Sequence, residues 1–168
     1  RYLKPEDFIT TNGIFNLDNH RLCSESLDFM SYDSYPNFAY MTDLYEGWKD
    51  GLLDRAWSRN LAEVRSISHR FGIMEQQSGA NGWTTRMEAP TPRPGQIRLW
   101  TMQSIAHGAD FVSYFRWRTA TMGTEIYWHG ILDYSGRENR RIAEIRRIYA
   151  DISRMQTLSG STYQARVA

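Results

Sequence analysis

Glu75 is the residue whose type and position most directly suggest chemistry. It ends the apolar run of residues 71–74 and is followed by Gln-Gln-Ser-Gly. A carboxylate at the end of a buried strand must be paired, hydrated or chemically useful. In the last case it can attack a substrate as a nucleophile or exchange a proton with it. The alternative is that Glu75 is the first solvated residue of a loop.

Aromatic and polar side chains elsewhere are candidates for holding a ligand. The chain has 6 Trp, 10 Tyr and 7 Phe, many of them among polar residues, as in "SYDSYP", "NGWTT" and "EIYWHG". Rings in such company suit sugars and other ligands of mixed polarity. Trp83, between Gly82 and Thr84, is expected to be such a platform; the alternative is a core residue. Glu125 suits the recognition of hydroxyl groups, or else is a solvated loop acid.

Three further residues could assist Glu75. Tyr35 could donate a hydrogen bond to it from a neighbouring strand, or could simply pack against Pro36. Arg116 or Arg118 could supply a positive field that keeps Glu75 ionised. The alternative for the arginines is an ion pair with a helix acid on the outside of the fold.

The sequence predicts no metal site and no cofactor. The four histidines, at positions 20, 69, 107 and 129, are not spaced as metal ligands. The single cysteine, Cys23, excludes a Cys-based zinc cluster and an internal disulfide. His107 lies near the end of a predicted helix, where a capping role is expected.

The predicted elements alternate between strands and helices. Strands are expected at residues 8–11, 27–32, 71–75 and 110–117, with no helical pattern between the first two. Apolar residues at intervals of three to four predict a helix over 53–70 and another near the C-terminal end. Pro94 in a first turn and Gly108 at a C-terminal stop predict a helix between them. This alternation is typical of an α/β fold with a parallel sheet and helices outside it.

Polar clusters follow the ends of all four predicted strands. They begin at Thr10, Asp33, Glu75 and Arg116. Catalytic groups of parallel α/β folds lie at the C-terminal ends of the strands. The four clusters should therefore share one rim, which favours a functional role for Glu75.

Length and charge narrow the class of protein. The 168 residues fit one domain, spanning positions 1–168. With 20 Lys+Arg against 19 Asp+Glu, the chain has no polyanion-binding character, and nucleic acid is not an expected partner. No apolar run approaches the length of a membrane span, so no membrane partner is expected. The compartment cannot be read from one cysteine, and the cytoplasm is taken as the default.

Six stretches resemble successive motifs of the glycoside hydrolase family 42 β-galactosidases. They are "ITTNG", "LDFMSYDSYP", "MEQQSGANGW", "RPGQIRLWTMQSIAHGAD", "YFRWR" and "TEIYWHGILDYSG", in family order and with family-like spacing. The resemblance implies a TIM (β/α)8 barrel that hydrolyses terminal β-D-galactosides with retention of configuration. The four strands would be numbers five to eight, so the chain would form a parallel (β/α) half-barrel.

The same resemblance implies roles for individual residues. Glu75 aligns with the family nucleophile, and Trp83 with a tryptophan that shapes the sugar subsite. Glu125 and His129 resemble the Glu and His that hold galactose hydroxyls. The family usually spaces that pair as Glu-x-x-His, whereas here the two residues are four apart.

One part of the family's machinery is expected to be missing. The general acid/base lies in an Asn-Glu at the end of strand four, and no Asn-Glu occurs in this chain. We therefore expect the C-terminal half of a catalytic barrel, inactive by itself, whose parent cleaves a galactoside or oligosaccharide. One rival is a non-catalytic carbohydrate-binding or pseudoenzyme module. The other is a scaffold whose open sheet edges pair with another chain, for example in a homo-oligomer.

Overall fold

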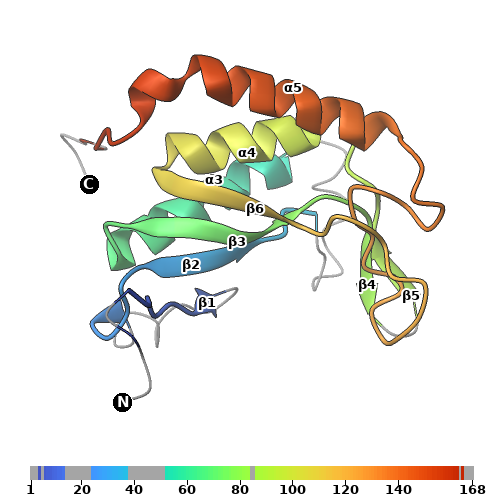
Figure 1. Cartoon of the computed structure of the whole chain (residues 1–168), viewed down its shortest axis with the longest axis horizontal. Helices are drawn as coiled ribbons and strands as arrows, with labels where there is room; N and C mark the ends of the chain where they lie inside the picture. Colours follow the sequence, from blue (N-terminus) through green and yellow to red (C-terminus); the bar gives the residue numbers. More distant parts are fainter. Residues whose placement is uncertain are drawn as a thin grey trace.

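Four parallel strands form the framework of the computed structural model (Figure 1). The structure describes residues 4, 6–13, 24–37, 52–83, 86–162 and 164, and only the backbone of 52–56, 83 and 86–88. Strands β1 (Asn12–Gly13), β2 (Met30–Ser34), β3 (Phe71–Gln77) and β6 (Ala109–Phe115) lie side by side in that order. Each neighbouring pair is parallel. This confirms the predicted parallel sheet with strands adjacent in chain order.

The first two strands begin later than predicted. Residues 8–11 run beside the second strand, but the strand itself is Asn12–Gly13. Ile9 N donates to Asp28 Oδ2 at 2.6 Å and Thr10 Oγ1 donates to the Phe29 carbonyl at 2.8 Å. Main-chain bonds also join the two segments here, from Asp28 N to the Ile9 carbonyl at 2.9 Å and from Ser31 N to the Thr11 carbonyl at 3.3 Å. The prediction that no helix separates these strands falls mainly on residues 14–23, which lie outside the described residues.

An irregularity in the β2–β3 pairing decides which way Glu75 faces. Tyr32 pairs with Ile73, but the next pair is Asp33 with Glu75, so β3 carries one extra residue, Met74. Tyr32 and Ile73 belong to the core on the helix side. Regular alternation would have put Glu75 on that side as well. The bulge instead turns Glu75 to the opposite face, beside Asp33.

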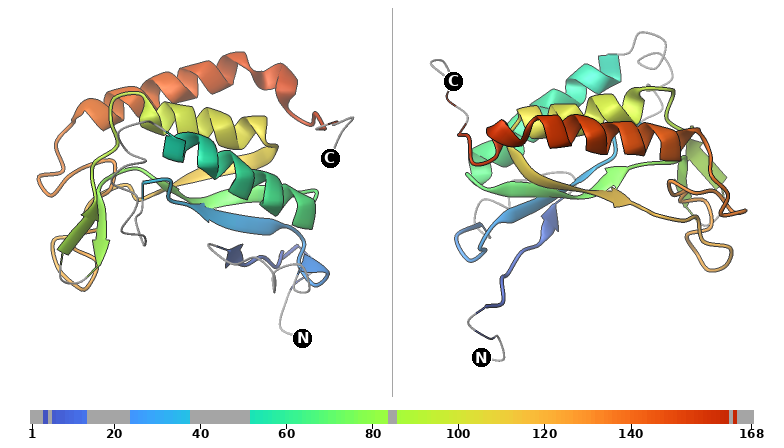
Figure 2. Two further views of the ribbon diagram at one scale, coloured as in Figure 1. Left: turned by 180° about the vertical axis from the view of Figure 1, so that it is seen from behind. Right: turned by 45° about the horizontal axis from the view of Figure 1, so that its top comes forward.

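The helices cover one face of the sheet (Figures 1 and 2). They are α3 (Leu52–Ile67), α4 (Gln96–Ala106) and α5 (Arg140–Arg154), followed by the short 3-10 helix η1 (Gln156–Leu158). The three helices were predicted, and Gly108 ends α4 with a φ of 97°, a conformation that favours glycine. Pro94 lies before the first turn of α4 instead of within it, because Gly95 is the N-cap.

The helix-side core has two clusters. One joins β2 and β3 to α3, through Met30, Tyr32, Phe71 and Ile73 of the strands and Trp57, Leu61 and Val64 of the helix. The other gathers Ile97, Ile131, Leu132, Ile142, Ile145 and Ile148 from α4, α5 and the loop before α5. The α5 isoleucines are the face that the sequence predicted. Burying them fixes α5, and with it the loop that precedes it.

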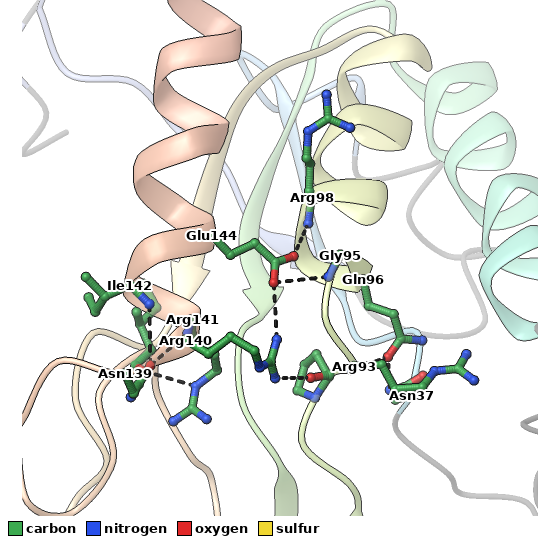
Figure 3. Close-up of polar contacts among 12 residues, drawn as sticks. Asn37, Arg93, Gly95, Gln96, Arg98, Asn139, Arg140, Arg141, Ile142 and Glu144 are labelled. Atoms are coloured by element: carbon green, nitrogen blue, oxygen red, sulfur yellow. Dashed lines mark hydrogen bonds and ion pairs between the residues drawn. The ribbon is translucent and has the colours of Figure 1, made fainter.

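The N-terminus of α4 is stabilised by a residue from α5 (Figure 3). Gly95 offers no side-chain cap, and Glu144 supplies the missing acceptors: it accepts from Gly95 N at 3.2 Å and from Arg98 N at 3.0 Å. Arg140 pairs with the same carboxylate at 3.2 Å. A carboxylate at a helix N-terminus satisfies free N–H groups and complements the helix dipole. Glu144, which is buried, therefore ties α5 to α4.

A hairpin that the sequence did not predict follows β3. Strands β4 (Asn81–Trp83) and β5 (Arg86–Ala89) pair antiparallel, in a stretch interpreted as a loop. Both strands are short and interrupted by a register shift, which leaves little periodicity in the sequence. The hairpin lies at the carboxyl end of the sheet, next to the loop before α5 (Figure 1).

Candidate active site

Glu75 lies half-buried near the carboxyl end of β3 and has one well-defined partner. Tyr35, just beyond β2, donates its hydroxyl hydrogen to Glu75 Oε2 at 2.6 Å. Of the two possibilities that the sequence left open for Tyr35, the hydrogen bond to Glu75 is therefore present. Burial, followed by the hydrogen bond to Glu75, raises the pKa of Tyr35 far above its ordinary value. The phenol therefore keeps its proton and remains a donor.

The Tyr35 ring is fixed by aromatic packing. It is 2% exposed and meets Trp128 edge-on, with ring centroids 5.1 Å apart and planes at 76°. Phe115 supports Trp128 from β6, at 6.2 Å and 84°. Edge-to-face contacts of this kind are favourable and directional. They hold the hydroxyl group in place against Glu75.

Asp33 is a second acid at this point that the sequence placed only within a polar cluster. It is 6% exposed and accepts from Asn12 Nδ2 through Oδ2 at 2.7 Å. Burial, and then the charge of Glu75, raise the pKa of Asp33 to about 7. The sequence signal that could have singled out Asp33 is an acid two residues before Tyr35, in a strand whose other residues are apolar or small. The bulge that brings it to Glu75 leaves no such signal.

The arginines considered as sources of positive charge for Glu75 have other contacts. Arg116 pairs with Glu125, through Nη1 to Oε2 at 3.3 Å and through Nη2 to the main-chain oxygen at 3.1 Å. Its guanidinium also lies 5.3 Å from the Phe115 ring centre. The Arg118 side chain lies against Gly136. Arg116 thus positions the loop acid, a function that the sequence did not suggest.

Glu125 lies on the exposed loop before α5, as predicted. The charges of Asp33 and Glu125 contribute, after burial and Glu75, to the raised pKa of Tyr35. Glu125 is therefore within electrostatic reach of the Tyr35–Glu75 pair. With its side chain 48% exposed, it remains open to a ligand.

His129 lies on the same loop and contacts Tyr134. Its Nε2 is 3.2 Å from the Tyr134 hydroxyl oxygen, and the two rings meet edge-on at 5.0 Å. Burial and the nearby Arg141 lower the pKa of His129, so the ring is neutral at neutral pH. A neutral imidazole can both donate and accept a hydrogen bond, which suits a sugar hydroxyl.

Two glycines let this loop approach the sheet. A Cβ on Gly79 would lie 2.3 Å from the His129 carbonyl oxygen, and one on Gly130 would lie 2.4 Å from the Arg116 oxygen. The His129 N–H donates to the Ala80 carbonyl at 2.8 Å across the first of these contacts. The loop is therefore seated directly on the end of β3.

The fourth expected ligand contact, Trp83, is described only in its backbone, at the end of β4. Its role as a sugar platform stays a prediction. Within the described residues, no group of three or more His, Cys, Asp or Glu is placed to hold a metal ion. No helix in that part of the chain is long and apolar enough to cross a membrane.

Comparison with known proteins gives a consistent result. The family model of glycoside hydrolase family 42, described as β-galactosidase, matches residues 1–155. The β-galactosidase BgaA of Clostridium cellulovorans is 40% identical over 154 residues, which are 90% of this chain and 22% of that protein. A β-galactosidase of Thermus thermophilus is 35% identical over 161 residues, 89% of this chain and 24% of that protein.

Solved structures agree with these sequence relatives. The β-galactosidase of the haloarchaeon Halorubrum lacusprofundi superposes with a TM-score of 0.78 at 33% identity, over 96% of this chain and 25% of that chain. The β-galactosidase of the psychrophilic Marinomonas ef1 superposes with a TM-score of 0.76 at 30% identity, over 91% of this chain and 24% of that chain. The chain thus spans about a quarter of the length of these relatives.

Proposed function

This chain belongs to the glycoside hydrolase family 42 β-galactosidases, and we propose that it forms strands five to eight of a catalytic (β/α)8 barrel in which Glu75 is the nucleophile. The observation that carries the assignment is the Tyr35 hydroxyl at 2.6 Å from Glu75 Oε2. It places a partly accessible carboxylate, with a fixed donor, at the carboxyl ends of parallel strands. Active sites of such barrels are built at that end.

The proposed reaction is the hydrolysis of a terminal β-D-galactoside with retention. Glu75 attacks the anomeric carbon and forms a covalent glycosyl-enzyme intermediate, which water then hydrolyses. Tyr35 occupies one carboxylate oxygen and leaves the other for the substrate. A second carboxyl group, about 5–5.5 Å away, must protonate the leaving oxygen. We assign it to a strand outside this chain, because no Asn-Glu occurs here.

The loop residues are proposed to bind the sugar. Glu125, held by Arg116, accepts from galactose hydroxyls as a charged acceptor. His129 is neutral and can donate or accept. Trp83 is proposed to provide the apolar surface for the sugar face, and Tyr35 to border the subsite. Both Glu125 and His129 come from the loop that Gly79 allows onto β3.

A chimera tests the assignment directly. This chain would replace the matching segment of the C. cellulovorans BgaA, so that the relative supplies the rest of the protein. We expect the chimera to hydrolyse an activated galactoside and the Glu75→Gly variant to lose that activity. Azide should then restore turnover to the variant and yield α-galactosyl azide, because it attacks the face that Glu75 normally occupies.

The product distinguishes the roles of the two carboxyl groups. Loss of an acid/base residue would give the β-product under the same rescue. A β-galactosyl azide product, or an active Glu75→Gly variant, would remove Glu75 from the nucleophile position. A chimera that binds galactosides but is inactive with Glu75 intact would favour the pseudoenzyme alternative.

A further inference from the structure

The bulge between β2 and β3 brings two carboxyl groups together. Asp33 and Glu75 are register partners on neighbouring strands, on the face opposite the helices. Neighbouring strands lie about 4.8 Å apart, and residues paired across them project to the same side. Two carboxylates at such a separation cannot both ionise without a large electrostatic cost, least of all when one is buried.

The hydrogen bonds of the pair are distributed unequally. Glu75 receives the Tyr35 hydroxyl, the strongest donor at this point. Asp33 receives one amide hydrogen, from Asn12 Nδ2 to Oδ2, and its buried Oδ1 has no partner among the described residues. A buried carboxylate with an unpaired oxygen is far less favourable than a neutral carboxylic acid in the same place, because the acid carries no net charge. Because Oδ2 is an acceptor already, the proton belongs on Oδ1.

We propose that Asp33 is a positioning residue for Glu75 that holds a proton on Oδ1, so that the pair carries a single negative charge and this charge lies on Glu75. The role as a partner of the nucleophile rests on the function proposed above, whereas the shared proton does not. The carboxyl pair would behave as one titrating unit. A charged Glu75 can attack the anomeric carbon, and a neutral Asp33 spares it a second negative charge.

The groups around the Asp33–Glu75 pair favour Asp33 as the member that carries the proton. Asp33 faces Glu75 of β3, Tyr35 of the segment after β2 and the uncharged Asn12 of β1. Tyr32 precedes Asp33 on β2 and faces α3. Burial raises the pKa of Tyr32 above its ordinary value, so this phenol keeps its proton. Glu125 adds a more distant negative charge. The described neighbours therefore include no cation that would hold Asp33 ionised, and burial and Glu75 raise the pKa of Asp33 to about 7.

Infrared difference spectroscopy on the chimera tests the proton directly. Between about pH 6 and about pH 8, the C=O stretch of a protonated carboxyl should disappear, and the Asp33→Asn variant should lack this change. In Glu75→Gln the same band should titrate at least about one pH unit lower, because the neighbouring charge is gone. A band that is absent from the unmodified chimera, or one that does not move in Glu75→Gln, overturns the proposal.

The pH profile of turnover tests the consequence for the site. Asn imitates a protonated Asp, since its amide nitrogen replaces the Oδ1 hydroxyl and its oxygen still accepts from Asn12. Asp33→Asn should therefore leave the acid limb of the pH profile where it lies in the unmodified chimera. A second negative charge essential for catalysis would give the opposite result: a loss of about a hundredfold or more and an acid limb at lower pH. That outcome overturns the proposal.

Asp28→Asn is the matched control. Asp28 is exposed, lies two residues before the start of β2 and accepts from Ile9 N, which an Asn oxygen can also do. It should leave both the infrared band and the pH profile unchanged. Because the infrared titration needs no turnover, the Asp33 proposal can fail while Glu75 passes the azide test, and the reverse.

Discussion

The candidate site has a part carried by strands and a part carried by a loop, and the two are held in different ways. Tyr35 and Asp33 are 2% and 6% exposed and are fixed by the strand ladder and by ring packing, whereas the Glu125 side chain is 48% exposed. In the proposed function, the strand part positions the carboxylate that attacks one carbon atom. The loop part offers groups suited to hydroxyls, for which a wider range of geometry suffices. Reacting groups tolerate displacement poorly, so the buried framework carries them.

The largest difference in kinetics between the strand part and the loop part should appear when one acid in each part is replaced by its neutral amide. In the chimera, Glu75→Gln should lower kcat by about a thousandfold or more, because an amide neither attacks nor stabilises the oxocarbenium-like transition state. Glu125→Gln keeps a polar group at the loop and should mainly raise KM, by about tenfold. Steady-state kinetics on both variants measures the contrast. Equal losses of kcat would show that Glu125 belongs with the reacting groups.

The next largest effect should come from the donor to Glu75. Tyr35→Phe keeps the ring against Trp128 and removes only the hydroxyl. A hydrogen bond to a carboxylate contributes about 1.5–3 kcal/mol, so kcat should fall by about 10- to 100-fold. Steady-state kinetics on the chimera measures this loss.

Tyr149→Phe controls for that substitution, because Tyr149 is 59% exposed on α5, away from the rim. It should leave kcat unchanged. If Tyr35→Phe raised KM but left kcat unchanged, the hydroxyl would serve the substrate directly and not Glu75.

A smaller effect is expected where the loop touches β3. Gly79→Ala would place a Cβ 2.3 Å from the His129 carbonyl oxygen, so the loop must shift. The expected result is a rise in KM of about tenfold with a lesser fall in kcat, and a lower thermal midpoint. Gly123→Ala is the control on the same loop: its Cβ meets nothing within 4 Å, although its φ of 92° makes any side chain strained. If the KM of Gly79→Ala were no higher than that of the control, the loop would not contribute to sugar binding.

The sequence predicted the sheet, its strand order and the three helices because these depend on periodic burial. The apolar run of residues 71–74 marks a buried strand, and the isoleucines of α5 recur at helical intervals. The Tyr35–Glu75 contact was also within reach, since parallel strands bring their carboxyl ends to one edge. These features follow from regular geometry alone.

What the sequence did not predict depends on single irregularities. A strict alternation from Phe71 and Ile73 places Glu75 under α3, and only the bulge at Met74 reverses this. The Asp33–Glu75 pair, the hairpin after β3 and the Arg116–Glu125 pair all depend on such local departures. Each is decided by three-dimensional neighbours, for which a one-dimensional pattern has no signal.

The smallest effect on catalysis should come from a buried charged contact outside the rim. Glu144 accepts from Gly95 N and Arg98 N at the start of α4 (Figure 3). Glu144→Gln retains one acceptor oxygen and places an NH2 group against helix N–H groups, which should lower the free energy of unfolding by about 1–3 kcal/mol. The thermal midpoint should fall, while kcat and KM stay within about twofold, since α4 covers the side of the sheet opposite Glu75. Asp151→Asn, which alters the more exposed pair with Arg98, is the control and should change the midpoint little. A fall in kcat with an unchanged midpoint would mean that the α4–α5 contact helps to position the catalytic groups. Glu144 would then belong to the candidate site and not only to the framework.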